Sequence, residues 1–164
     1  MTTGSSAGGN APKDGAAAFR GVSPLVLDAK GRLAIPAKHR DTLRDGGAGL
    51  VITADPSRCL LLYPRQIWEP IQAQLMSFSS FEDRIRSWQR LLVGYADDVD
   101  IDASGRILVP PMLREYARID RDVVLVGQGH RFEIWDQNAW HAQTERAAEF
   151  PANGLPPELG GFAL

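Results

Sequence analysis

A ten-residue phrase occurs twice in this chain: residues 27–36 read LDAKGRLAIP and residues 101–110 read IDASGRILVP. Both copies run hydrophobic, Asp, Ala, any residue, Gly, Arg, aliphatic, any residue, aliphatic, Pro. Asp28 of the first copy lies 74 positions before Asp102 of the second. A long repeated phrase indicates two copies of one structural unit. Two copies are too few for a solenoid, so we expect a pseudo-two-fold pair.

The repeat extends beyond this phrase. Residues 25–44 aligned with residues 99–118 share seven identities in twenty positions. Farther along the chain the spacing between equivalent residues shortens from 74 to 72 positions, and Trp68 then matches Trp140. The two copies therefore form tandem units that account for most of the chain. The seven identical pairs are Asp28/Asp102, Ala29/Ala103, Gly31/Gly105, Arg32/Arg106, Pro36/Pro110, Arg40/Arg114 and Arg44/Arg118.

Each copy has the same local pattern. A short apolar strand leads into a turn with Asp at its first position and Gly at its fourth, where these residues are favoured. Residues 32–35 then alternate as a half-buried strand does, and Pro36 suits the first turn of a helix. Strands over residues 50–53 and 59–63 follow, and a second helix begins. The second copy repeats this order and ends in a helix over residues 136–148, which predicts a β-rich α+β fold.

Composition divides the chain into five segments. Residues 1–18 are rich in Gly, Ser and Ala, which predicts a disordered N-terminal extension. The tail over residues 149–164 is rich in Pro and Gly, and we expect it to be flexible. Repeat 1 spans residues 19–65 and repeat 2 spans residues 95–148, joined by connecting helices over residues 66–94.

The connecting segment has two apolar series at helical spacing. We expect its helices to cover the sheet; the alternative is a subunit interface around Trp88. The two series are Ile67, Ile71, Leu75 and Phe78, and then Phe81, Ile85, Trp88 and Leu92.

The bulk composition is that of a globular protein. The 164 residues are 44% hydrophobic and 23% charged, and no apolar stretch approaches the ~20 residues of a membrane span. The single cysteine, Cys59, lies in an apolar run where a buried, inert thiol is the ordinary state. A reducing, cytoplasmic location fits a chain with one cysteine.

The charge is unevenly distributed. The net charge of the chain is −2, which argues against nucleic-acid binding if taken alone. Residues 28–44, however, hold five basic and two acidic side chains, a net charge of +3. The equivalent residues 102–118 hold three basic and two acidic side chains, a net charge of +1. Positive charge is therefore concentrated at the repeated phrase, and more at its first copy.

An enzymatic role finds little support in these residues. Two tandem copies with one Asp each suggest an aspartic-protease dyad, but an Arg four residues on keeps a carboxylate ionised and so opposes a shared proton. The three histidines have no metal-ligand spacing, and the nucleotide-binding glycine motifs are absent from the sequence. We expect no catalysis, no metal and no cofactor. The histidines are His39, His130 and His141.

Two interpretations of the Asp–Arg pair stay open. In the structural one, Asp28 and Asp102 accept backbone N–H bonds within their own turns, and Gly31 and Gly105 supply φ > 0. In the recognitional interpretation, these turns expose Arg32 and Arg106 so that the two side chains can bind a partner.

Arginine presents a rigid fork that matches phosphate oxygens and the O6/N7 edge of guanine. We favour DNA recognition, because a turn lock alone does not need a guanidinium. The predicted DNA contacts are Arg32, Arg106, Lys30, Lys38 and Arg40.

The two motifs carry a family resemblance. Residues 19–43, FRGVSPLVLDAKGRLAIPAKHRDTL, and residues 101–119, IDASGRILVPPMLREYARI, resemble the MraZ family of bacterial transcriptional regulators. The resemblance implies two tandem AbrB-like units of the swapped-hairpin type, forming one pseudo-two-fold barrel with peripheral helices. It also implies that the motif arginines, Arg32 and Arg106, contact DNA.

The resemblance further implies a function and its partners. We expect a repressor of the division and cell-wall gene cluster that binds direct repeats in promoter DNA, assembled as a homo-oligomeric ring and associated with the nucleoid. A ring-forming scaffold and an AbrB-class antitoxin are the alternatives. An antitoxin would need a toxin-neutralising C-terminal segment, and the tail is poorly patterned for one.

Overall fold

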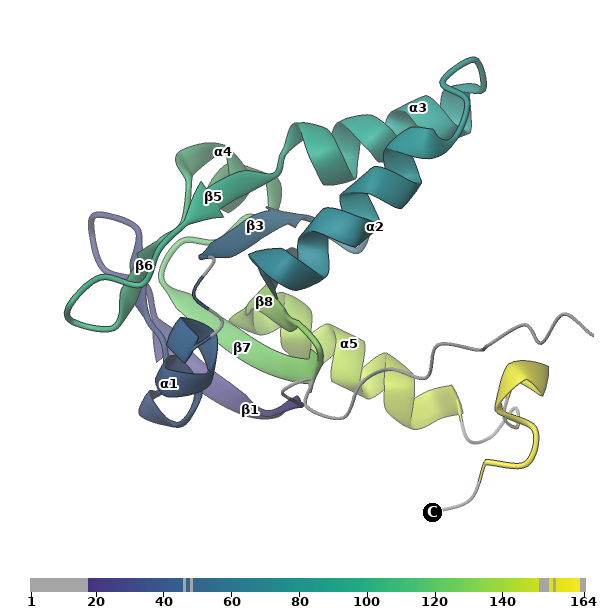
Figure 1. Cartoon of the computed structure of the whole chain (residues 1–164). Coiled ribbons are helices and arrows are strands. Elements are labelled where there is room, and N and C mark those ends of the chain that lie inside the picture. Colours follow the sequence, from purple (N-terminus) through teal and green to yellow (C-terminus); the bar gives the residue numbers. More distant parts are fainter. Residues whose placement is uncertain (1–17, 46, 48, 151–153, 155, 163–164) are drawn as a thin grey trace, which may run out of the picture.

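The first repeat forms the elements that its sequence pattern predicts. The computed structural model describes residues 18–45, 47, 49–150, 154 and 156–162 (Figure 1). The predicted extension over residues 1–18 lies outside them apart from Ala18, and the predicted tail lies partly outside. The elements of the first repeat are β1 (Phe19–Val26), β2 (Arg32–Ala34), α1 (Ala37–Asp45), β3 (Leu50–Ala54), β4 (Leu60–Pro64) and α2 (Arg65–Ser77).

The second repeat has the same element order. Pro110 and Pro111 begin its first helix, where the missing N–H of proline costs no hydrogen bond. Its elements are β5 (Asp97–Val99), β6 (Arg106–Leu108), α4 (Pro111–Tyr116), β7 (Asp122–Gly129), β8 (Phe132–Asp136) and α5 (Gln137–Glu149). The other described elements are α3 (Asp83–Gln89), the π-helix η1 (Arg90–Gly94) and the 3-10 helix η3 (Pro157–Leu159).

The two repeats exchange their strands. The described strands form a six-stranded sheet in the order β1-β7-β8-β4-β3-β5 and a two-stranded sheet of β2 and β6. Strand β1 of repeat 1 pairs with β7 of repeat 2, and β5 of repeat 2 pairs with β3 of repeat 1. All pairs are antiparallel. Neither repeat therefore completes its own sheet.

One pair of strands shows the pseudo-symmetry directly. Strand β4 pairs with β8, and Leu61 faces Glu133, its own equivalent after the 72-residue shift. An antiparallel pair of equivalent strands places the pseudo-two-fold axis between its central residues. The predicted pseudo-two-fold pairing of the repeats is thus present, and the closure of the two sheets into an AbrB-like barrel stays a prediction.

The core lies between the two sheets and helices α1 and α4. It combines aliphatic side chains of both repeats, including Leu33, Ile52, Leu62, Ile107 and Ile134, each fully buried. Burial of such side chains contributes roughly 1.5–3 kcal/mol each. The core thus joins both repeats into one folding unit.

The connecting helices cover the sheet only at one end. Trp68, Ile67 and Ile71 of α2 pack against Val51 and other residues of the sheet, as the amphipathic pattern predicts. Farther along, α2 and α3 leave the body of the molecule as a helical hairpin (Figure 1). Phe81 at its tip is 98% exposed, and Phe78 and Trp88 are about half exposed. Phe78 of the first series and Phe81 and Trp88 of the second therefore do not cover the sheet as expected, whereas Leu92 at the end of the second series packs against it.

Candidate nucleic-acid interface

Each repeated phrase folds as a turn closed by its own aspartate. Oδ1 of Asp28 accepts hydrogen bonds from the backbone N–H groups of Lys30 (3.0 Å) and Arg32 (2.8 Å), and its Oδ2 accepts from Arg32 Nε (2.7 Å). The backbone N–H of Gly31 donates to the Asp28 carbonyl at 3.0 Å. Gly31 has φ +82°, which explains the glycine.

The second turn repeats these bonds. Oδ1 of Asp102 accepts from the backbone N–H groups of Ser104 and Arg106, both at 2.9 Å, and its Oδ2 accepts from Arg106 Nε at 3.2 Å. Gly105 has φ +79°. The structural and recognitional interpretations are thus compatible, since the same aspartate closes the turn and holds the arginine.

These contacts keep both aspartates ionised. The backbone N–H bond from Arg32, and then its side chain, lowers the pKa of the Asp28 carboxyl. Asp102 has a lowered pKa for the same reason, with the backbone bond from Arg106 as the main cause. Each carboxylate therefore remains a fixed anionic anchor for its arginine at neutral pH.

The anchored arginines stay accessible. Their side chains are 32% and 33% exposed for Arg32 and Arg106, respectively. Each uses Nε for its aspartate, and among the described residues we find no hydrogen-bond partner for the terminal nitrogens of either guanidinium. Each guanidinium thus has two terminal nitrogens that can bind an acceptor outside the chain.

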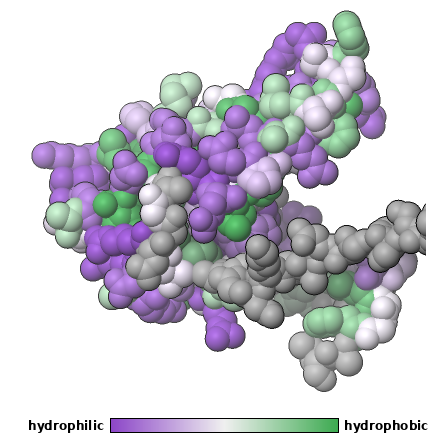
Figure 2. All heavy atoms as spheres, in the orientation of Figure 1, coloured by the Kyte–Doolittle hydropathy of each residue, from purple (hydrophilic) through white to green (hydrophobic). Residues whose placement is uncertain are grey.

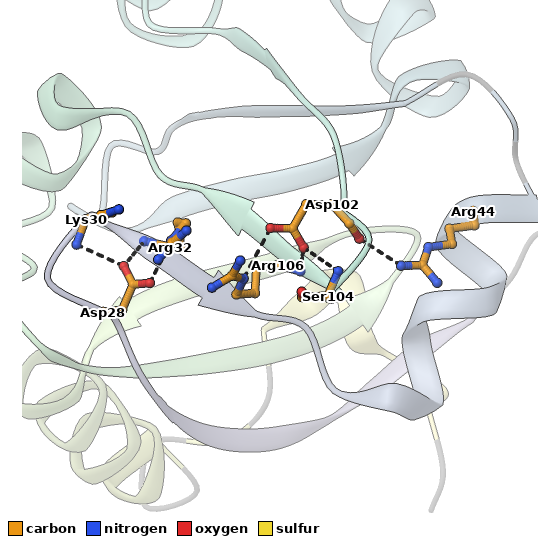
Figure 3. Close-up of polar contacts among 7 residues, drawn as sticks. All are labelled: Asp28, Lys30, Arg32, Arg44, Asp102, Ser104 and Arg106. Carbon is orange, nitrogen blue, oxygen red and sulfur yellow. Dashed lines mark hydrogen bonds and ion pairs between the residues drawn. The ribbon is translucent and has the colours of Figure 1, made fainter.

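Both arginines lie on one ribbon. Strands β2 and β6 pair with Arg32 opposite Leu108 and Ala34 opposite Arg106. Facing residues of an antiparallel pair point to the same side, as do residues two apart on a strand. All four side chains therefore share one face, and Figure 3 shows the two arginines side by side with their aspartates beyond them.

The other predicted basic contacts have different environments. Lys30 is exposed in the first turn. Lys38 is exposed on α1 and reaches back over β1, where a Cβ at Gly21 would lie 2.9 Å from its Nζ. Arg40 is half-buried, and its Nε donates to the Ile35 carbonyl at 2.7 Å. Lys30 thus adds charge within the first turn, Lys38 lies against β1 of the six-stranded sheet, and the Arg40 Nε is engaged within the fold.

Two arginines that sequence reasoning did not select also contact the turns. Arg44 of α1 donates from Nη2 to the Asp102 carbonyl at 3.0 Å (Figure 3). Arg114 of α4 lies against Gly31, where a Cβ would be 2.7 Å from its Cζ. Their identity between repeats, Arg44 with Arg118 and Arg40 with Arg114, was the available signal in the sequence.

Other kinds of site find no support in the described part of the chain. It contains no group of three or more His, Cys, Asp or Glu side chains that could hold a metal ion. Burial, and then the neighbouring Glu133, raises the pKa of the Cys59 thiol, so this cysteine is a poor nucleophile. None of the described helices has the length and apolar character needed to cross a membrane.

The fold and ribbon define a two-repeat α+β protein with paired Asp–Arg turns. A family model described as "MraZ protein, putative antitoxin-like" matches residues 18–91 and again residues 92–154. The chain therefore belongs to the MraZ family, as the resemblance in its two motifs indicated.

Individual relatives agree with this assignment. The transcriptional regulator MraZ of Thiobacillus denitrificans is 53% identical over 147 residues, which cover 89% of this chain and 99% of the relative. The proteins of the same name from Nitrosospira multiformis and Methylobacillus flagellatus are 56% and 54% identical over the same shares. These relatives are named for transcriptional regulation and not for a reaction, as expected for a non-enzymatic family.

Proposed function

We propose that this protein is a sequence-specific DNA-binding transcriptional regulator, acting as a repressor, that reads DNA with the β2–β6 ribbon. One observation carries the proposal: Arg32 and Arg106 share one exposed face, and each is oriented by its own ionised aspartate. The major groove of B-DNA admits a two-stranded β-ribbon. The ribbon thus has a suitable form for direct base readout.

The geometry of each guanidinium suits guanine. Its Nε side is bound to Asp28 or Asp102, so its terminal nitrogens project from the ribbon as a pair. A paired donor matches the O6 and N7 acceptors of guanine. Lys30 and Lys38 supply charge for neighbouring phosphates, which fix the position of the ribbon without reading sequence.

The low net charge favours repeated binding sites. One ribbon neutralises few phosphates, and the chain as a whole has a net charge of −2, so a single copy should bind weakly. Linked copies that meet direct repeats gain affinity through effective concentration. We therefore propose that the protein acts as a homo-oligomeric ring on direct repeats. The α2–α3 hairpin, which Figure 2 shows with apolar groups among hydrophilic ones, exposes Phe78, Phe81 and Trp88, and these side chains support self-association.

Family membership supports the location of the target. We propose that the repeats lie in the promoter of the division and cell-wall gene cluster, upstream of the gene for this protein, and that the protein is cytoplasmic and nucleoid-associated. A nuclease footprint on that upstream DNA tests the proposal. We expect evenly spaced protected segments at submicromolar protein. The absence of any protected segment at every protein concentration, on DNA that extends several hundred base pairs upstream, would contradict the proposal.

A scaffold role and an antitoxin role are the competing functions. The description of the matching family model mentions an antitoxin likeness. A pull-down with the purified protein separates the regulator from both alternatives: DNA enriched in one sequence supports the regulator, whereas capture of one protein without DNA supports the scaffold or the antitoxin.

A further inference from the structure

We propose that Arg114 and Arg40 are positioning residues that act crosswise between the repeats. Arg114 of repeat 2 holds the turn that carries Arg32, and Arg40 of repeat 1 holds the turn that carries Arg106. The inference rests on the proposed function, since only DNA binding gives the two turns a task. Its structural part is tested without DNA.

The first contact links Gly31, Val109 and Arg114 through two hydrogen bonds and one packing contact. The backbone N–H of Val109 donates to the Gly31 carbonyl at 2.8 Å, and the Val109 carbonyl accepts from Arg114 Nε at 3.1 Å. The guanidinium of Arg114 then lies over Gly31, where a Cβ would be 2.7 Å from Cζ. The planar group thus occupies the space that any side chain at position 31 would need.

The second contact repeats the first with the repeats exchanged. The backbone N–H of Ile35 donates to the Gly105 carbonyl at 2.9 Å, and the Ile35 carbonyl accepts from Arg40 Nε at 2.7 Å. A Cβ at Gly105 would be 2.5 Å from Arg40 Cζ. The same three-residue arrangement on both sides of the axis is consistent with a requirement of the fold.

The antiparallel ribbon explains why the contacts cross. Strand β2 leads into α1 and strand β6 leads into α4, and the two strands run in opposite directions. The helix that follows one strand therefore begins beside the turn that precedes the other strand. Each helix can reach the opposite turn with one long side chain.

The contact bears on the recognition arginine because the glycine and the arginine are adjacent. Gly31 directly precedes Arg32, and its N–H closes the turn on the Asp28 carbonyl at 3.0 Å. A displaced Gly31 would displace the Asp28 and Arg32 pair with it. We therefore expect loss of Arg114 to disturb the first pair and loss of Arg40 to disturb the second.

Carboxyl titration by NMR tests this crossed dependence directly. The bonds from each arginine lower the pKa of its own aspartate, so a loosened turn raises that pKa. In Arg114→Ala we expect the pKa of Asp28 to rise by about half a unit or more and that of Asp102 to stay unchanged. Arg40→Ala should give the reverse. Equal shifts at both aspartates, a shift in the same repeat, or no shift in either variant would overturn the proposal.

Arg→Lys variants separate the planar contact from charge. Lysine keeps the positive charge but has no planar group to cover a glycine. We expect Arg114→Lys to raise the pKa of Asp28 as Arg114→Ala does. A wild-type pKa in the lysine variant would show that charge alone acts and would contradict the positioning role. The lysine variants also provide the same test if an alanine variant fails to fold, which circular dichroism monitors.

DNA binding supplies the second readout, measured at low salt on the upstream DNA so that weak complexes remain measurable. We expect Arg114→Ala to weaken binding about tenfold in the wild-type and Arg106→Ala backgrounds and to have no further effect in the Arg32→Ala background. An equal loss of affinity in the Arg32→Ala and Arg106→Ala backgrounds would indicate a direct or general role for Arg114 and would overturn the inference. Crossed pKa shifts in a protein that binds no DNA would instead contradict the proposed function alone.

Discussion

Leu33 of β2 and Ile107 of β6 face each other across the ribbon, although they occupy equivalent positions of the two repeats. Both side chains are 0% exposed. Because successive side chains of a strand point to opposite faces, burial of this central pair places Arg32 and Arg106 on the outer face of the ribbon. A register slip of one residue would bury the arginines and expose the core. One pairing therefore accounts for both the core and the candidate interface.

The two arginines are expected to contribute unequally to DNA affinity. Arg32 lies 2.7 Å from its aspartate oxygen and has Lys30 in its turn, whereas the Arg106 distance is 3.2 Å and its turn has Ser104. We expect Arg32→Ala to cost about 1–3 kcal/mol of binding free energy and Arg106→Ala to cost less. Fluorescence anisotropy on the upstream DNA measures both. A larger loss for Arg106→Ala would contradict the inferred asymmetry.

Binding should weaken steeply with salt. Each phosphate that the protein neutralises releases condensed counterions, so two such contacts give a loss of about tenfold between 50 and 200 mM salt. Anisotropy titrations at four salt concentrations give the slope. Substitution of Lys38, which is exposed on α1, should reduce the slope without changing which sequence is preferred. A flat salt response would rule out phosphate-led binding.

The local elements could be predicted from the residues themselves, whereas the exchange of strands between repeats was indicated only by the family resemblance. Asp28, Gly31 and Pro36 mark a turn and a helix start through local chemistry, and the structure has both where expected. The exchange of β1 and β5 between repeats depends on which apolar strands meet in space. Two similar repeats offer similar strand surfaces, so the sequence pattern does not distinguish pairing within a repeat from pairing between repeats.

The candidate nucleic-acid interface could likewise be predicted only in part. Arg32 and Arg106 follow from the motif, but their position on a single ribbon follows from the pairing of β2 with β6. Arg40 was predicted as a DNA contact because it lies near other basic residues in sequence. Its helix also directs it to the Gly105 turn, 65 residues away, and a DNA contact by Arg40 stays a prediction. The exposure of Phe81 could not be predicted, because a helical apolar series has the same spacing whether it covers a sheet or projects from it.

Stability should fall between neutral and mildly acidic pH because of His39. The ring of His39 is buried between Phe19 and Phe132, and burial, followed by repulsion from Lys38, lowers its pKa. A lowered folded-state pKa means that the unfolded chain binds the proton more readily. Stability is therefore full above the unfolded value of about 6.5 and declines as pH falls below it. Urea unfolding at pH 8 and pH 5.5 measures the loss.

His39→Phe is the matched variant for this test. Phenylalanine keeps the aromatic contacts with Phe19 and Phe132 and has no proton to bind. We expect the variant to lose less stability between pH 8 and pH 5.5 than the wild type. The exposed histidines, His130 and His141, are unchanged in it and control for other titrations. An identical pH dependence in both proteins would show that His39 is not the cause.

The hairpin tip should control assembly and not folding. Phe81 is 98% exposed, so Phe81→Asp removes no core contact within the protomer and should leave the thermal midpoint unchanged. If the tip packs on a second copy, a buried charge there should shift the protein to smaller species. Light scattering after size-exclusion chromatography measures the mass. Phe150→Asp, at an exposed position on the end of α5, is the control expected to keep the wild-type mass.

The most direct test of the account is DNA binding by the double variant Arg32→Ala/Arg106→Ala, compared with Arg146→Ala. Arg146 is an exposed arginine in the last turn of α5, and Figure 1 shows this end of the helix away from β6 of the ribbon. Electrophoretic shift on the upstream DNA gives the affinity, and light scattering shows whether assembly is kept. We predict that the double variant loses specific binding but keeps the wild-type mass, whereas Arg146→Ala keeps both the binding and the mass of the wild type. Wild-type affinity in the double variant would contradict recognition by the ribbon.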